Sequence, residues 1–162
     1  MLYFFVKYLH IIAAVFLFGF GMGSYLYLIA AVRGRNPVVV AEVARLVVRF
    51  DTWVTTPAGV LQLASGLGMA YLAGWPLGSG WLRDALLIFA AVGLLWLPVL
   101  VLQGRLRHLA AAAAAAGQPL DEAFARQYRP WFWMGVAGFS GMFITVLLMV
   151  TKRSLGAWLG LG

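Results

Sequence analysis

KYLHIIAAVFLFGFGMG, residues 7–23, is a run of apolar residues long enough to cross a lipid bilayer. A helix over the wider apolar segment 8–32 would rise ~38 Å, which exceeds the ~30 Å hydrocarbon core of a membrane. A helix is the expected form because hydrocarbon offers no water to the backbone N–H and C=O groups. His10 lies near the start of this run, where hydrocarbon begins, and its role bears directly on function.

The overall composition is that of a membrane protein. Hydrophobic residues make up 64% of the 162 residues and charged residues 10%, whereas a soluble domain carries about 25% charged residues. The mean hydropathy is +0.92. There are no cysteines, which excludes disulfides, zinc–thiolate sites and covalent haem attachment.

Four segments are long and apolar enough to be spans. We expect them at 8–32, 57–73, 85–102 and 131–151, with Thr56 capping the second and Pro57 opening it. Alternating strand patterns are absent from the sequence. The prediction is an all-α membrane protein, residues 1–162 forming a single domain built as a bundle of four transmembrane helices. We expect the first run to be a transmembrane span and not a signal peptide, because no basic region precedes it.

The positive charges predict an orientation. The net charge is +7, and eight arginines lie in the connections 33–53 and 103–130. They are Arg33, Arg35, Arg45, Arg49, Arg105, Arg107, Arg126 and Arg129. Lys7, Arg83, Lys152 and Arg153 lie on the other side. The positive-inside rule then predicts a multi-pass protein of a bacterial inner membrane with both termini periplasmic. Such clustering indicates contact with anionic lipid and not with nucleic acid.

Two shorter helices are expected in the connections. NPVVVAEVARLVVRFD, starting at Asn36, has a cap followed by Pro37 at the first helical position. Its valines and its charged face predict a short interfacial helix lying on the inner leaflet in the first cytoplasmic loop. The second connection should be helical on both sides of a break at 117–119.

His10 is the first candidate functional residue. An ionisable residue inside a membrane span is costly to bury and is therefore a functional candidate. The other interpretation is a histidine that hydrogen-bonds a partner side chain or a carbonyl group. His108 lies on the opposite side of the membrane and cannot meet His10 in one protomer, so no zinc or copper site with three or four protein ligands is expected.

Haem differs because the porphyrin supplies four of the iron ligands. We therefore consider a haem b with His10 as an axial ligand and Met69 or Met149 as a possible second one. Lys7, Lys152 and Arg83 are candidates to pair with its propionates. Each of these residues also has a simpler interpretation, since methionine packs in membrane helices and Lys or Arg side chains extend to the interface.

The remaining polar and glycine residues favour helix packing. Gln62, Ser65 and Gln103 are expected to form interhelical hydrogen bonds. None of the five acids falls inside a predicted span, so we expect no carboxylate path through the bilayer. Gly19 and Gly23 form a GxxxG motif, and Gly135, Gly138 and Gly141 follow one face of the fourth span; close helix packing is the simplest reason.

Four stretches together resemble a known family. They are KYLHIIAAVFLFGFGMG, TTPAGVLQLASGLGMAYL, LWLPVLVLQGRLRHLA and RPWFWMGVAGFSGMFITVLLMVTK. In order and spacing, over nearly the whole chain, they resemble the bacterial membrane proteins of domain-of-unknown-function family 2269. This resemblance implies the fold more than a function.

A weaker resemblance bears on function. Lys7 and His10 in an early K-x-x-H, and Lys152 closing the last span, are similar to residues of the bacterial membrane protoporphyrinogen oxidase. That resemblance implies b-type haem ligation by His10 and a functional role for Lys152. The last span ends here in KRSL, where that family has lysine followed by proline. The resemblance therefore extends to haem binding and not to the specific oxidase activity.

Two functions stay open from the sequence. One is a haem b protein that transfers electrons or oxidises a small apolar substrate near the outer leaflet, with a redox partner; whether it turns over as an enzyme is undecided. The other is a cofactor-free subunit or scaffold that packs with another membrane subunit, or as a homodimer, through its glycine-rich faces.

Overall fold

The computed structural model describes residues 1–78 and 80–160, and every regular element in this range is helical. Three long helices are apolar enough to cross a membrane: α1 (Leu2–Arg33), α4 (Gly80–Ala115) and α5 (Glu122–Thr151). Between the first two, α2 (Pro37–Phe50), the π-helical turn η1 (Asp51–Thr55) and α3 (Thr56–Leu72) follow one another without a break. The chain then ends in the short helix α6 (Leu155–Trp158).

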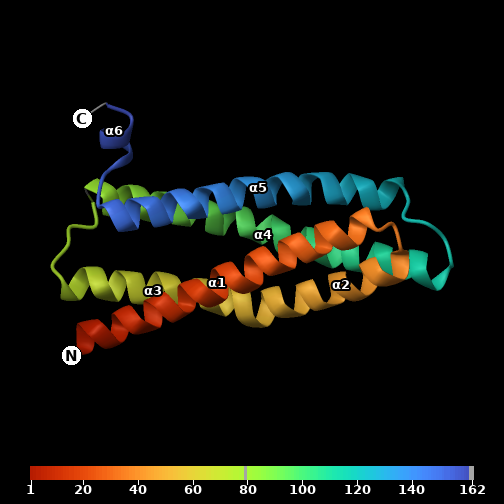
Figure 1. Cartoon of the computed structure of the whole chain (residues 1–162), viewed down its shortest axis with the longest axis horizontal. Helices are drawn as coiled ribbons and strands as arrows, with labels where there is room; N and C mark the ends of the chain where they lie inside the picture. Colours follow the sequence, from red (N-terminus) through yellow and green to blue (C-terminus); the bar gives the residue numbers. More distant parts are fainter. Residues whose placement is uncertain (79, 161–162) are drawn as a thin grey trace.

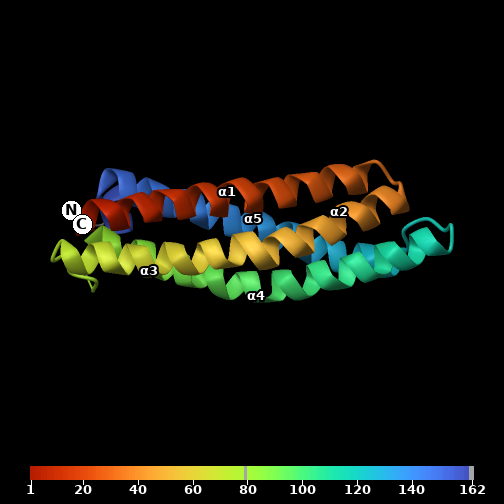
Figure 2. The same cartoon turned by 90° about the horizontal axis from the view of Figure 1, so that it is seen from below.

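The helices form a long antiparallel bundle (Figures 1 and 2). The N-terminus, the α3–α4 connection and α6 lie at one end, which we call the histidine end because His10 is near it. The α1–α2 turn at 34–36 and the α4–α5 connection at 116–121 lie at the other end, the arginine end. The predicted spans 8–32, 85–102 and 131–151 each lie within one helix, whereas the span 57–73 extends one residue beyond α3, which has only 17 residues by itself.

The continuous helix from α2 to α3 has local causes. Asn36 caps it as predicted, since its Oδ1 accepts hydrogen bonds from the backbone N–H groups of Val38 at 3.0 Å and Val39 at 3.4 Å. The π turn then precedes Pro57, whose ring excludes the normal backbone bond and widens the helix. Thr56 was expected to cap a new helix, but it is helical itself and its Oγ1 donates to the Asp51 carbonyl oxygen at 2.7 Å.

The position of α2 differs from the predicted interfacial helix. Val40, Ala44 and Val47 are buried, and they pack against α1 and α4. The exposed face carries Glu42 and Arg45, which form an ion pair. The face that we assigned to lipid is therefore covered by protein, because the helix continues into α3 and stays aligned with the bundle.

The hydrophobic core is concentrated toward the arginine end. It includes Leu28 of α1, Val40 of α2, Leu106 of α4 and both Phe124 and Trp131 of α5, each at most 3% exposed. Toward the histidine end, large apolar side chains remain exposed on the outside of every helix. Exposed large apolar side chains also occur toward the arginine end, among them Tyr27, Val38 and Trp133, as expected for a helical bundle that sits in lipid.

The helices pair unevenly along the bundle. α1 packs closely along α3, and α4 packs closely along α5. Toward the histidine end the two pairs approach each other only sparsely, and two cavities lie between them. The predicted break at 117–119, between α4 and α5, is confirmed. Gly117 has a φ of +62°, and Asp121 caps α5 by accepting from the Phe124 N–H at 2.9 Å.

Candidate functional site

His10 bridges α1 and α3 through both of its ring nitrogens. Nδ1 lies 3.0 Å from Oγ of Ser65, and Nε2 lies 2.9 Å from Nε2 of Gln62. The Ser65 hydroxyl donates its own proton to the Leu61 carbonyl oxygen at 2.6 Å. The histidine is therefore held in one orientation by residues one turn apart on the neighbouring helix.

The geometry of these contacts is compatible with a proton on Nδ1 of His10. Because the Ser65 hydroxyl proton is used toward Leu61, its oxygen is the acceptor and His10 Nδ1–H is the donor. Nε2 then has a free lone pair, which accepts from the Gln62 amide N–H. This is a neutral imidazole with its lone pair on Nε2, the form in which histidine ligates a metal.

A glycine makes this packing possible. A Cβ atom on Gly66 would lie 3.1 Å from Cε1 of His10. A larger residue would push the imidazole away from α3 and break its two hydrogen bonds. The glycine in the second predicted span is therefore explained by the ring that lies over it.

A cavity of about 440 Å³ lies beside His10. The structure brings most of the predicted site residues to it: Lys7, His10, Met69, Met149 and Lys152 all line its wall. These residues come from α1, from α3 and from the last turn of α5 and the residue that follows it. The two lysines lie toward the histidine end, and the rest of the lining is mostly apolar.

Lys152 lies against two indole rings at this end of the bundle. Its Nζ is 3.7 Å from the ring centroid of Trp81 and 4.8 Å from that of Trp75. Lys152 has a left-handed backbone, with φ of +56°, directly after α5. Partial burial, with a smaller effect from the Lys7 ammonium, lowers the pKa of the Lys152 side chain. In its protonated form this side chain can attract an anionic group.

Arg83 and His108 do not line the cavity beside His10. Arg83 forms an ion pair with Asp84 at 2.8 Å and is absent from the lining of the cavity beside His10. The other oxygen of Asp84 accepts from the Leu155 N–H at 2.9 Å and so fastens α6 to the start of α4. His108 lies toward the arginine end of α4, where its ring contacts Arg107.

Two features of the interior were missed from the sequence. Gln62 and Ser65 were expected to join helices, but nothing in their spacing showed that His10 is their partner. Asp51, which we placed in a connection, is fully buried in η1. Its carboxylate accepts from the side chains of Gln103 at 2.6 Å and Thr55 at 2.9 Å. The only available signal was that Asp51 is the last residue of the amphipathic segment that starts at Asn36.

Metal ligands supplied by protein alone do not gather in the part of the chain that the structure describes. No group of three or more His, Cys, Asp or Glu side chains lies together there.

The long apolar helices, the lipid-facing surface and the buried polar contacts between helices define an α-helical integral membrane protein. The chain belongs to the family described as "Predicted integral membrane protein (DUF2269)", whose model matches residues 4–153. The family expected from the sequence is thereby confirmed. The searches among curated proteins and among solved structures gave no match.

Proposed function

We propose that this protein binds a b-type haem at the histidine end of the bundle, with His10 as an axial ligand. It would transfer electrons or oxidise a small apolar substrate near the outer leaflet of a bacterial inner membrane. Two observations support the proposal: His10 Nδ1 lies 3.0 Å from Ser65 Oγ, and His10 is part of the wall of a cavity of about 440 Å³.

The surrounding residues suit this ligand. A histidine that binds a metal almost always donates its other ring N–H to an oxygen acceptor, which here is Ser65. Lys7 and Lys152 offer cations for two propionates, and Met69 or Met149 offers a second axial ligand. Arg83 remains a further candidate at the same end, since its side chain is 53% exposed.

Gln62 is the residue that must move. Its Nε2 now occupies the lone pair of His10, while its Oε1 is buried without a hydrogen-bond partner among residues 1–78 and 80–160. Rotating the side chain therefore gives up one neutral hydrogen bond, a net cost of about 1 kcal/mol, and can satisfy the unpaired oxygen. When bound, haem iron would supply the redox chemistry, and the chain would orient the cofactor and exclude water.

The proposal includes a topology of four crossings. α1 and α4 would be ~48 and ~54 Å long at 1.5 Å per residue, so both extend beyond a ~30 Å hydrocarbon core. The arginines and the packed core gather toward the arginine end, which supports placing that end in the cytoplasm and both termini in the periplasm. α3 would complete the fourth crossing together with η1.

The visible spectrum of the purified protein tests haem binding. Protein expressed in haem-replete cells should show a Soret band that shifts on reduction with dithionite. His10→Ala should lose this band, whereas His108→Ala, the matched control at the other end, should keep it. Gln62→Leu should keep or increase haem occupancy, because it removes the group that competes for Nε2.

Two results would overturn the proposal. One is a colourless, monodisperse preparation from cells that supply haem. The other is a Soret band that is unchanged in His10→Ala. If the protein binds haem, the spectra of Met69→Leu and Met149→Leu should be compared. The variant that has lost a second axial ligand should show shifted absorption bands in the reduced state.

One observation favours a cofactor-free subunit as a second candidate. The fourth-span glycines are used within the chain, since Gly135 faces Tyr25 and Gly141 faces Val92. A Cβ on Gly19, in contrast, would have no neighbour within 4 Å among the described residues, and one on Gly23 would meet only Tyr27 of the same helix. This GxxxG face is free to dock a second copy. Gly19→Ile should then convert a dimer to a monomer in light scattering.

A further inference from the structure

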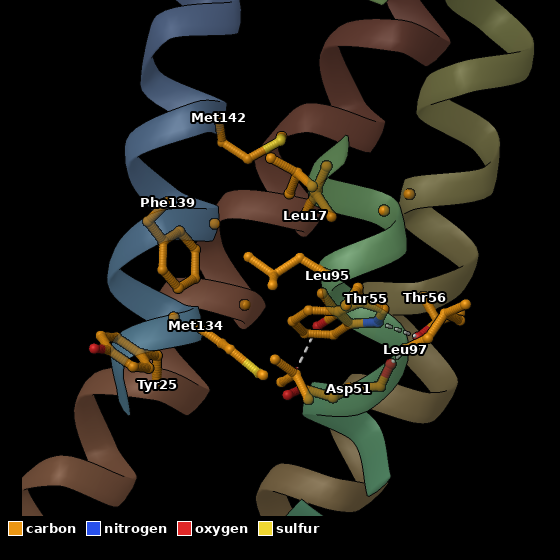
Figure 3. A pocket seen from close by; sticks show the side chains of 18 of the residues that line it. Leu17, Tyr25, Asp51, Thr55, Thr56, Leu95, Leu97, Met134, Phe139 and Met142 are labelled. Atoms are coloured by element: carbon orange, nitrogen blue, oxygen red, sulfur yellow. Dashed lines mark hydrogen bonds between the residues drawn. The ribbon is translucent and has the colours of Figure 1, made fainter. Parts of the chain in front are cut away.

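A second cavity lies between the helix pairs, further from the histidine end, and none of the site residues predicted from the sequence lines it. Its volume is about 310 Å³, and residues of α1, η1, α3, α4 and α5 line it. Figure 3 shows Asp51, Thr55 and Thr56 on one side of this cavity and Phe139 and Met142 on the other. The walls are almost entirely apolar apart from this buried polar group.

Two buried polar atoms at this cavity have no partner in the described part of the chain. They are Oε1 of Gln103, an acceptor, and Nε1–H of Trp131, a donor. Both residues line the cavity and are only 3% and 1% exposed. Unpaired buried polar groups are uncommon in native proteins, and each costs about 1–3 kcal/mol.

Neither atom is free to find a partner elsewhere. Gln103 is oriented by its own Nε2, which donates to Asp51 Oδ2 at 2.6 Å, so its carbonyl oxygen is the group left over. Trp131 is held in place by the neighbouring rings of Tyr25 and Tyr128, at centroid distances of 5.1 and 5.7 Å. The nearby indole of Trp96, in contrast, is satisfied by Thr56 at 3.2 Å.

We propose that this cavity is a binding site for a small apolar molecule that carries a hydroxyl group, such as a phenol. A ligand hydroxyl can accept from the Trp131 N–H or donate to Gln103 Oε1, while an apolar body fills the remaining space. The volume supports a substituted ring, since a cavity of about 150 Å³ with apolar walls already holds benzene. The inference uses other residues than His10 and does not depend on haem.

The ligand would arrive from the bilayer. Val60 and Leu97 line the cavity and are 66% and 59% exposed on the lipid-facing surface. The cavity also shares the wall residues Phe18, Leu63, Phe89 and Met142 with the cavity beside His10. An apolar molecule bound here therefore lies next to the first cavity as well as to lipid.

Photo-crosslinking in nanodiscs tests this site with two matched probes, 4-hydroxybenzophenone and benzophenone. Benzophenones react readily with methionine, and Met134 and Met142 both line the cavity. We expect saturable labelling of these methionines by the hydroxylated probe, with about tenfold weaker labelling by benzophenone, as one lost hydrogen-bonding group implies. Trp131→Phe should reduce the preference for the hydroxylated probe to near unity.

A cavity-filling variant provides the second measurement. A Cβ on Gly138 would meet Leu95 and Val92 only at 4.0 Å, so Gly138→Val should fold and narrow the cavity. It should weaken labelling, whereas Gly19→Val, the same change outside the cavity, should not. Equal labelling by the two probes, labelling that Gly138→Val leaves unchanged, or no saturable labelling at all, as for a cavity that holds only water, would each overturn the proposal.

Discussion

Tyr25 shows how a single glycine can shape this bundle. Its hydroxyl donates to the Phe132 carbonyl oxygen at 2.8 Å, and its ring packs near Trp131 and Phe139. The ring lies directly over Gly135, where an added Cβ would overlap it. Gly135, one glycine of the face predicted for the fourth span, is therefore covered by an aromatic ring of α1, which joins the two helix pairs, whereas Gly138 and Gly141 face α4.

At the residue scale we predict that Gly135→Ala destabilises the protein by about 1–3 kcal/mol, the usual cost of overpacking. Tyr25 cannot move aside without losing its hydrogen bond and its aromatic contacts. Gly104→Ala is the matched control, because a Cβ there has no described neighbour within 4 Å. Denaturation in mixed detergent micelles measures both. Equal stability of the two variants would contradict the packing that we describe.

α2 contributes one side of the hydrophobic core at the arginine end. A helix lying on lipid and a helix packed in a bundle can have the same sequence pattern, since both need one apolar face. Here the buried face is Val40, Ala44 and Val47, and neighbouring valines such as Val39 remain exposed. This arrangement extends the four-helix packing past the point where the apolar spans would leave the membrane.

At the element scale we predict different results for one substitution at two adjacent valines. Val40 is 0% exposed and Val39 is 47% exposed. Val40→Asp would bury an unpaired charge and should cost about 3–5 kcal/mol, enough to prevent folding. Val39→Asp should change stability by only ~0.5 kcal/mol.

Expression level and resistance to proteolysis compare the two α2 variants. If α2 instead lay on the inner leaflet, its outward valines would contact lipid, and Val39→Asp would then be the more damaging change.

The whole molecule combines two helix pairs that are tightly joined at one end and loosely joined at the other. The core toward the arginine end is closed by α2, whereas one cavity lies beside His10 and the other lies between the helix pairs further from the histidine end. If the proposed ligand enters from the bilayer, the packed end would keep the two pairs aligned.

At the scale of the whole chain we predict the sidedness of labelling. The protein has no cysteines, so single substitutions report without background. In intact bacteria, a membrane-impermeant maleimide should label Gly78→Cys in the α3–α4 connection. It should label Gln118→Cys in the α4–α5 connection only after the cells are opened. The reverse pattern would invert the proposed orientation, and labelling of both in intact cells would mean that α4 does not cross the membrane between these two connections.

The sequence by itself determined the class of protein and the position of its helices. Apolar runs, the Asn36 cap, Pro57 and the break at Gly117 act within one or two helical turns, so they can be read without a partner. The same local signals failed at α2, where they are compatible with two different environments. They also did not show that Asp51, counted among the residues of a loop, is enclosed by the bundle.

Only the tertiary structure decided which residues meet. The hydrogen bonds of His10 to Gln62 and Ser65, and that of Asp51 to Gln103, join helices that are distant in sequence. The unpaired atoms of Gln103 and Trp131 likewise depend on how the helices pack. Such contacts depend on the rotation and axial register of one helix against another. Those two quantities result from packing over the whole interface, because in a chain this apolar almost every face of a helix can contact either protein or lipid.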